Sequence, residues 1–327
     1  MSPAHVVDRH DSWQEPGTEQ QWSDSFYFGG GDGRGLAFYA RIGRRPNEQI
    51  TEAALGAWLP GQGFLLSFAR IPSAGVSVIE AGPLSFGCLL PLVTWDIRFE
   101  GEGRLFERAE HVATDRGAYR QVPAAAILRF TAWGHPLSFK SGLAAGVATD
   151  HYEQPGSVAG TLVVDGRRHP LAGRGMRDHS WGVRDWQQVP YWRWFGMVVD
   201  PDNFIVLNNV GLGGGGETAG GFMMRNGEIA PIASCDTESE LDPELGAQRS
   251  FTAKAVDALG RETTLRGRAL EVAPLRQRRD GRLTHANEAL TDYEWEGRRD
   301  TGISEYLTQM PPAGKPAVGL REGAASS

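Results

Sequence analysis

The sequence has few of the features that define several common protein classes. It contains only two cysteines, Cys88 and Cys235, and their wide separation indicates neither a disulfide framework nor a cysteine-based metal site. Its longest apolar runs fall far short of the ~20 residues that a membrane-spanning helix requires. The N-terminus lacks a basic region followed by an apolar one, so we expect no signal peptide and a soluble, cytoplasmic protein without an integral membrane segment.

The chain also carries more negative than positive charge, and its sequence lacks helical periodicity. The formal net charge is −7, which argues against a general nucleic-acid partner. No window keeps the apolar spacing of an amphipathic helix over about twelve residues or more. No two of the eight histidines have the i,i+2 or i,i+4 spacing of a local metal site, so we expect no metal, although ligands could still converge in space.

Glycine and tryptophan are abundant, with 43 and 10 copies, and the chain alternates between short strands and turns. Asp165-Gly166 and Asn226-Gly227 each separate two strand-like runs, the pattern typical of tight β-hairpins. The glycine-rich run at 211–216 has no βαβ context, so it indicates a hairpin loop and not a nucleotide site. We count about sixteen candidate strands, which favours an all-β chain of two tandem antiparallel barrels or sandwiches.

The pattern also predicts where these domains lie. Both ends are polar or rich in Pro, Gly, Ala and Ser, so we expect them to be flexible tails. A break in the strand pattern near residues 183–192 divides the ordered chain. The predicted segments are an N-terminal tail at 1–20, a first domain at 21–186, a second domain at 187–310 and a C-terminal tail at 311–327.

One stretch, "GRGMRDHSWGVRDW" at residues 173–186, concentrates cations, acids, an imidazole and indoles. If it is extended, side chains alternate between two faces, so Asp178, His179 and Ser180 cannot form a self-contained triad. A buried polar face must meet a ligand or pair internally. The internal alternative is a structural network between domains. The expected faces are Arg177, His179 and Trp181 on one side and Met176, Asp178 and Ser180 on the other; the network would comprise Arg177, Asp178, Arg184 and Asp185, with Trp181 and Trp186 as apolar plugs.

Two further stretches carry acidic candidates. In "ATDHYEQPGSVAG", His151 and Glu153 share one strand face, and burial would favour Glu153 as a proton donor; a hydrogen-bonded strand end is the alternative. In "DYEWEGRRDTGISEY", Glu305 stands beside Ile303 and Leu307 on an apolar and therefore inward face. An inward Glu305 needs a partner, for which we expect an arginine of residues 173–186.

The segment from "HYEQPGSVAG" to "RGMRDHSWGVRDW" resembles the signature of the carotenoid 1,2-hydratase (hydroxyneurosporene synthase) and AttH-like superfamily, in an uncharacterised bacterial branch. The resemblance implies two lipocalin-like antiparallel β-barrel domains. It implies either hydration of isoprenoid double bonds by acid catalysis or guided cyclisation of polyenes, without a metal or organic cofactor. The residues that match the motif are Asp178, His179 and Trp181.

These observations lead to three functional hypotheses. The first is a cofactor-independent hydratase or cyclase-like lyase for a hydrophobic isoprenoid, polyketide or steroid-like alkene, with Asp178 or Glu153 as the acid and His179 as its orienter or relay. The second is a lipocalin-like protein that binds a hydrophobic molecule without chemistry, and the third is a scaffold that fastens two barrels. The sequence does not indicate an oligomeric state. The expected substrate-binding residues are Trp181, Trp186, Tyr152, Arg177 and Trp194, and the expected structural network includes Arg184, Asp185 and Glu305.

Overall fold

The computed structural model describes residues 6–73, 78–113, 119–138, 150–184, 189–279 and 281–310. In these ranges the chain forms nineteen β-strands and three short 3-10 helices, so the predicted all-β class is confirmed. None of the helices there is long and apolar enough to cross a membrane. The chain divides into two compact units, one of residues 1–108, 117–140 and 145–184 and one of 109–116, 141–144 and 185–327.

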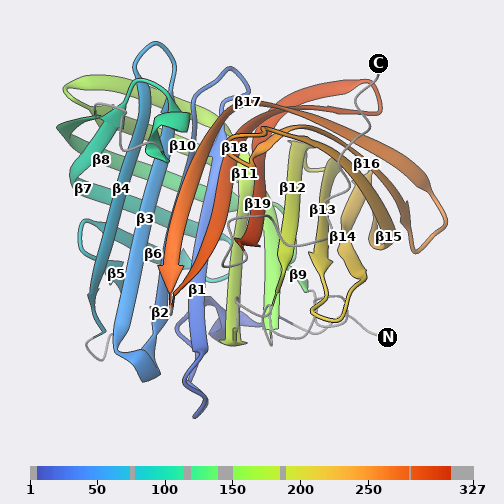
Figure 1. Cartoon of the computed structure of the whole chain (residues 1–327), viewed down its shortest axis with the longest axis horizontal. Helices are drawn as coiled ribbons and strands as arrows, with labels where there is room; N and C mark the ends of the chain where they lie inside the picture. Colours follow the sequence, from blue (N-terminus) through green and yellow to red (C-terminus); the bar gives the residue numbers. More distant parts are fainter. Residues whose placement is uncertain are drawn as a thin grey trace. The chain divides into compact units, whose positions relative to one another are not determined.

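The first unit is a single antiparallel sheet that returns on itself (Figure 1). Its strands follow the order β4-β3-β2-β1-β11-β10-β8-β7-β6-β5, and β9 is added beside β10. A further pairing joins β4 to β7 through Phe64, Leu65 and Leu66. The elements are η1 (Asp8–Asp11), β1 (Trp22–Gly31), β2 (Ala37–Arg45), η2 (Pro46–Glu48), β3 (Ile50–Leu59), β4 (Gly63–Pro72), β5 (Ile79–Ala81), β6 (Leu84–Leu90), β7 (Thr94–Phe106), β8 (Tyr119–Ala132), β9 (Leu137–Ser138), β10 (Asp150–Val164) and β11 (Arg167–Val183).

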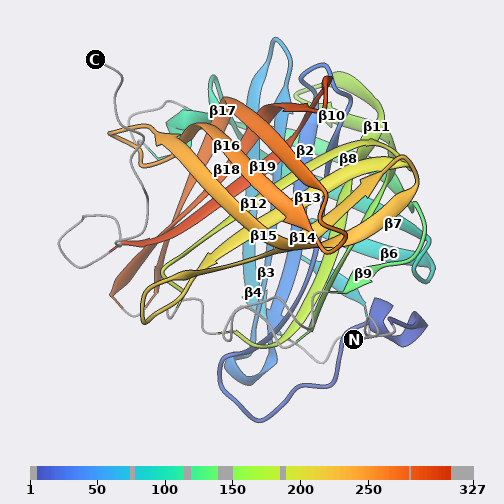
Figure 2. The ribbon, with the colours of Figure 1, turned by 90° about the vertical axis from the view of Figure 1, so that its right-hand side faces the viewer.

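The second unit is a closed antiparallel barrel of eight consecutive strands, β12 to β19, as Figure 2 shows in yellow to red. An eight-stranded barrel leaves an interior that side chains can fill or that can hold one small ligand. Together with the first unit it confirms the predicted lipocalin-like fold. The elements are η3 (Ala109–Val112), β12 (Tyr191–Asp200), β13 (Asn203–Gly211), β14 (Glu217–Arg225), β15 (Glu228–Leu241), β16 (Gln248–Asp257), β17 (Glu262–Arg279), β18 (Arg282–Trp295) and β19 (Arg298–Met310).

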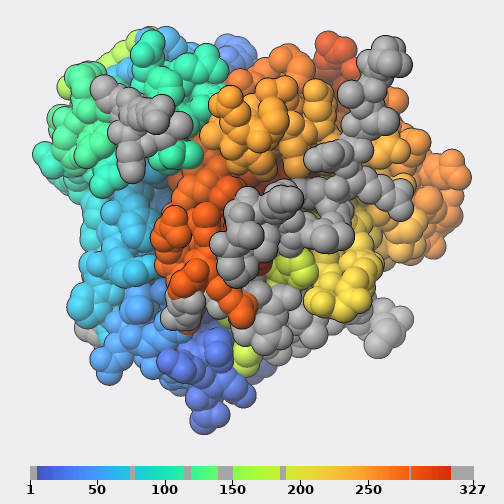
Figure 3. All heavy atoms as spheres, in the orientation of Figure 1, coloured from blue at the N-terminus to red at the C-terminus, as the bar shows by residue number. Residues whose placement is uncertain are grey.

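Each unit has its own apolar core. The core of the first is rich in phenylalanine and includes Phe26, Phe28 and Trp95, whereas that of the second includes Phe195 and Tyr306. These residues alternate with outward-facing neighbours along their strands, as expected for sheets that bury one face. In the space-filling view, the earlier part of the first unit appears in blue to teal (Figure 3).

Local turn chemistry was predicted correctly. Asp165 and Gly166 have φ values of 51° and 77° and join β10 to β11, and Asn226 and Gly227 have φ values of 53° and 81° and join β14 to β15. Both pairs have the two positive φ values of a type I′ turn. The glycine-rich run at 211–216 connects the paired strands β13 and β14, in keeping with the predicted hairpin loop. The predicted domain boundary at residue 186 and the C-terminal tail at 311–327 lie outside the described residues.

Two glycines of β11 allow an unusually close approach to β1. A Cβ atom on Gly173 would lie 1.8 Å from the carbonyl oxygen of Gly31, and one on Gly175 would lie 1.9 Å from that of Gly29. Neither distance is compatible with a side chain unless the two strands separate. These glycines therefore fix the position of β11, and with it the side chains that follow in residues 177–181.

The substitution Gly175→Ala tests this packing. We expect it to lower the free energy of unfolding by ~3 kcal/mol, because the added methyl group forces backbone to move. Gly214→Ala is the control, since nothing lies within 4 Å of its added Cβ, and it should change stability by less than ~0.5 kcal/mol. Urea denaturation of both variants measures the difference, and equal stabilities would contradict the argument.

Candidate functional site

The residues of the signature stretch at 175–181 are extended on β11, so the predicted alternation of faces is confirmed. The register places Arg177 opposite Gln154 of β10, and His179 opposite Tyr152 of β10 and Phe26 of β1. Cross-strand partners share a face of the sheet, and Phe26 belongs to the apolar core. Arg177 and His179 therefore point into the first unit.

Arg177 is a fully buried cation, and its anionic partner Asp11 is buried as well. Its guanidinium donates Nη1–H to Asp11 Oδ1 at 2.8 Å and Nη2–H to Asp11 Oδ2 at 3.2 Å. Its Nε–H donates to Gln154 Oε1 at 2.8 Å. The guanidinium carbon lies 5.4 Å from the ring centroid of Trp95 and 5.2 Å from that of Tyr152. Such bidentate pairing and ring contact compensate for the lost hydration of the charge.

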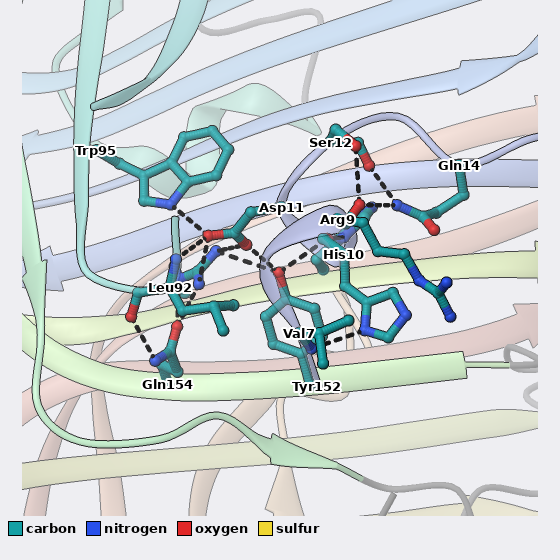
Figure 4. Close-up of polar contacts among 12 residues, drawn as sticks. Val7, Arg9, His10, Asp11, Ser12, Gln14, Leu92, Trp95, Tyr152 and Gln154 are labelled. Carbon is teal, nitrogen blue, oxygen red and sulfur yellow. Dashed lines mark hydrogen bonds and ion pairs between the residues drawn. The ribbon is translucent and has the colours of Figure 1, made fainter. Parts of the chain in front are cut away.

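Several segments of the chain donate hydrogen bonds to the carboxylate of Asp11 (Figure 4). Besides Arg177, its carboxylate accepts hydrogen bonds from the Leu92 backbone N–H, the Tyr152 hydroxyl and, at 3.3 Å, the Trp95 indole. Burial raises the pKa of Asp11, but the Arg177 charge and these hydrogen bonds lower it by more, so the net pKa lies below the ordinary value. Asp11 is therefore ionised at neutral pH. Burial in turn holds the pKa of Tyr152 well above its ordinary value, so Tyr152 donates as a neutral phenol.

His179 is held at both ring nitrogens. Nδ1 lies 2.6 Å from the carbonyl oxygen of His10, and Nε2 lies 2.6 Å from Oδ1 of Asp24, itself fully buried. A carbonyl oxygen can only accept, so Nδ1 carries a proton. The other oxygen of Asp24 accepts the Gln14 backbone N–H at 2.7 Å. The ring stacks on Phe26 with centroids 3.7 Å apart. His179 thus links β11 to His10 near the N-terminus and to Asp24 of β1, and neither ring nitrogen is left for another partner.

Residues 7–14, here called the N-terminal segment, provide most of these partners. The segment contains η1, and Asp11 is only 4% exposed. We expected residues 1–20 to be a flexible tail, and for the N-terminal segment this was wrong. The physical reason is the polar face of β11, which requires acceptors inside the unit. Arg177 and His179 take partners from the beginning of the chain, which the sequence did not indicate.

The opposite face of the same strands brings together both candidate acids. Glu153 of β10 and Asp178 of β11 are direct cross-strand partners, and Tyr27 of β1 is the next neighbour of Asp178. Glu153 is 2% exposed and Asp178 is half-buried. His151 lies on the same face, with its Nε2 3.2 Å from Glu153 Oε1. The two carboxyl groups therefore lie on one face of the sheet, and His179 lies on the other.

The remaining expected residues of the stretch occupy different surroundings. Trp181 is half-buried, with its ring centroid 4.7 Å from that of His179 and 5.3 Å from that of His10. Arg184 donates to the hydroxyl of Ser25 at 3.0 Å. Asp185 and Trp186, also expected to contribute, lie outside the described residues. Tyr152 and Arg177 belong to the buried network and not to the face that carries Glu153.

In the second unit, the predicted inward orientation of Glu305 was wrong. Its neighbour Tyr306 belongs to the barrel core, so Glu305 lies on the outer face, where it accepts the Trp192 indole N–H at 2.7 Å. Trp194 is its cross-strand partner on that outer face. Both faces of β19 carry apolar residues. The sequence pattern alone therefore does not reveal which face points into the barrel. An ion pair of Glu305 with an arginine of residues 173–186 stays a prediction.

Sequence reasoning missed Asp11, Asp24 and the amide of Gln154 as partners of the signature stretch. The one available signal was the need for buried cations to have anions nearby, and it does not identify which of the acidic residues provides them. Across the described ranges, no group of three or more His, Cys, Asp or Glu side chains is placed to hold a metal ion.

Comparison with known proteins places the chain in a family. A family model described as a domain of unknown function (DUF7064) matches residues 8–310. The chain belongs to this family. The match begins at η1, so the N-terminal segment lies within the family's domain. A search of curated protein sequences finds no match.

Several solved structures share the fold of this chain at low sequence identity. An AttH-like protein of Nitrosomonas europaea matches with a TM-score of 0.57 and 13% identity, covering 93% of this chain and 98% of its own. CghA matches with a TM-score of 0.58 and 12% identity, over 92% and 94%. Kievitone hydratase of Nectria haematococca matches with a TM-score of 0.54 and 10% identity, over 94% of both chains. These likenesses, at 10–13% identity, show a shared fold.

The substitution Asp11→Asn tests the buried ion pair. We expect it to lower the free energy of unfolding by ~3–5 kcal/mol, because Arg177 is left as a buried cation without its anion. Asp8→Asn is the matched control, since it removes the same charge from an exposed position of η1 and should cost less than ~0.5 kcal/mol. Chemical denaturation of the three proteins at pH 7 measures the difference. A loss below ~1 kcal/mol for Asp11→Asn would show that the pair does not hold the segment.

The same pair predicts acid sensitivity. The folded-state pKa of Asp11 is lowered, so the unfolded chain binds the proton more readily and the stabilisation is present above pH ~4. It is lost as the pH falls through the folded-state pKa. The stability difference between the wild type and Asp11→Asn should therefore shrink between pH 5 and the lowest pH at which both fold. Denaturation curves at stepped pH values check this, and a constant difference would contradict it.

Proposed function

We propose that this protein is a cofactor-independent lyase of the hydratase or cyclase type, in which Glu153 and Asp178 perform acid–base chemistry on a hydrophobic alkene. The observation that carries the proposal is the register, which makes the two carboxyl groups direct cross-strand partners with one of them almost fully buried. Similarity in fold to a kievitone hydratase supports the reaction class.

The register brings the two carboxyl groups within reach of one substrate. Opposite residues on neighbouring strands have Cβ atoms about 4.5–5.5 Å apart, and their side chains share a face of the sheet. Burial favours the neutral form of a carboxyl group, and Glu153 is more deeply buried than Asp178. We therefore assign Glu153 as the acid and Asp178 as the base.

The reaction follows from these roles. Glu153 donates its proton to one carbon of the double bond, and the other carbon becomes a cation. A water molecule adds its oxygen to this cation, and Asp178 accepts the proton that the water loses. Proton transfer between the two carboxyl groups restores the starting state. In a polyene, a second double bond adds to the cation in place of water, the ring closes with the charge on a new carbon, and Asp178 removes a proton from the neighbouring carbon to give the neutral cyclised alkene.

The surroundings of the acid pair fit a cationic intermediate. Tyr27 is the cross-strand neighbour of Asp178, and its ring is stacked with that of Tyr39 at 6.4 Å between centroids. Aromatic faces and carboxylates both stabilise a developing positive charge. In this proposal His179 is a positioning residue, because it holds β11 from the opposite side of the sheet. Trp186, which lies outside the described residues, stays a candidate for contact with the substrate, whereas Trp181 lies with His179 on the other face of the sheet.

The substrate class rests on resemblance. An isoprenoid alkene follows from the likeness of the signature stretch to carotenoid 1,2-hydratase, and a polyketide or steroid-like alkene is the alternative. A hydrophobic molecule fits the almost complete burial of Glu153, because water-free surroundings favour apolar ligands.

A carrier of hydrophobic molecules is the second candidate. The closed eight-stranded barrel of the second unit favours it, since barrels of this size can hold one small ligand. A carrier and a lyase differ in what they release. Native mass spectrometry of the purified protein reveals a retained molecule, which a carrier returns unaltered after incubation.

Incubation with geraniol and other isoprenoid alkenes in deuterated water tests the lyase. The wild type should add deuterium and hydroxide across a double bond, detected by mass spectrometry. Glu153→Gln and Asp178→Asn should each reduce turnover by ~10²–10⁴-fold, because each removes one proton-transfer group. Asp165→Asn is the control, as it makes the same charge change in the β10–β11 turn and should retain activity. Undiminished turnover in both site variants would exclude this pair as the acid and base.

A further inference from the structure

The barrel of the second unit encloses an arginine without an anionic partner. Arg193 of β12 is 3% exposed, and its cross-strand partners are Asn209 and Tyr306, so it faces the interior. Its Nη1–H donates to the carbonyl oxygen of Thr237 at 3.2 Å, while its Nε is buried without a hydrogen bond. The guanidinium carbon lies 5.1 Å from the ring centroid of Tyr191 and 5.7 Å from that of Tyr306. Within the described ranges, Arg193 forms no ion pair at 4.0 Å or less.

The acidic residue Glu217 lies next to the neighbours of Arg193, and its carboxylate is bonded to them and not to Arg193. One of its carboxylate oxygens accepts the Asn209 side-chain N–H at 2.7 Å, and the other accepts the Tyr191 hydroxyl at 2.8 Å. Burial and the bond to Glu217 raise the pKa of Tyr191 to about 12, so Tyr191 keeps its proton at neutral pH. Glu217 itself is exposed, at the start of β14. Both of its oxygens are thus satisfied without Arg193.

The amide of Asn209 is equally fixed. Asn209 is fully buried, its nitrogen also donates to the carbonyl oxygen of Cys235 at 3.0 Å, and its oxygen accepts the Thr237 hydroxyl at 2.7 Å. It cannot turn toward Arg193 without breaking these bonds. The surroundings therefore hold the arginine in place, while the nearby Glu217 carboxylate is bonded to Tyr191 and Asn209 and makes no direct ion pair with it.

Arg177 of the first unit shows what is missing. It too is buried, lies between two aromatic rings and has an amide residue, Gln154, as its cross-strand partner. Arg193 likewise lies near two aromatic rings and opposite an amide residue, Asn209, but the Asn209 amide is bonded to other groups, whereas Gln154 accepts from Arg177. A second difference is the carboxylate, since Arg177 has Asp11 in bidentate contact. A buried cation without an anion is strongly unfavourable, so the arrangement around Arg193 is suited to receive one.

We infer that Arg193 binds the carboxylate of a small organic acid inside the second barrel, in the role that Asp11 has in the first unit. The planar guanidinium suits a carboxylate, which can bridge two of its N–H groups. The flanking rings of Tyr191 and Tyr306 provide apolar contacts for the carbon atoms of such an acid. This binding site belongs to the second unit and does not depend on the chemistry proposed for Glu153 and Asp178.

Isothermal titration calorimetry with acetate and octanoate tests the site, with 1-octanol as the uncharged control. At least one of the two carboxylates should bind the wild type saturably at pH 7. Arg193→Met should weaken that binding by ~10–100-fold, as expected for the loss of charge-assisted hydrogen bonds. Arg268→Met, which removes the same charge from a largely exposed side chain of the same barrel, should bind like the wild type. Absence of saturable binding to either carboxylate, or equal binding by Arg193→Met, would overturn the inference.

Thermal unfolding without added ligand provides an independent readout. Replacing an unneutralised cation by methionine should leave the Tm of Arg193→Met unchanged or higher, whereas Arg177→Met should lower the Tm by leaving Asp11 unpaired. A lower Tm or a failure to fold for Arg193→Met would mean that the barrel already compensates the charge, and the inference would be wrong.

Discussion

The ion pair between Arg177 and Asp11 is the interaction on which the first unit depends. The guanidinium of Arg177 has no exposed surface, and the anion that compensates its charge comes from a residue 166 positions earlier in the chain. Binding Asp11 brings the carbonyl of His10 to His179 and the backbone N–H of Gln14 to Asp24. One buried charge therefore orders the whole N-terminal segment and makes it part of the unit's interior.

The same interaction positions the opposite side of the sheet. Because successive side chains of a strand alternate, fixing Arg177 and His179 inside also fixes Asp178 outside. The close approach of β11 to β1, which only glycine at 173 and 175 permits, prevents the strand from rotating or slipping. The pairing of Asp178 with Glu153 is thus held by elements that do not take part in the proposed chemistry. Such support is what precise positioning of reacting groups requires.

The two units resolve the same electrostatic problem differently. Each buries one arginine between aromatic rings and opposite an amide side chain, Gln154 in the first unit and Asn209 in the second. The first unit neutralises its cation with its own chain and so gains stability. In the second, Arg193 has no ion pair among the residues that the structure describes, and the proposed anion site rests on this difference.

The amino-acid sequence by itself determined the all-β class, the Asx-Gly hairpin turns and the alternation of faces along β11. Each of these depends on neighbours within a few residues, so local patterns are sufficient. The partners of the signature stretch were decided only by tertiary structure, because residues 7–14 have no periodicity and an anion's sequence position does not reveal which cation it meets. The orientation of β19 was decided in the same way. Its two faces are both apolar, and only closure of the barrel determined that Tyr306 points inward and Glu305 outward.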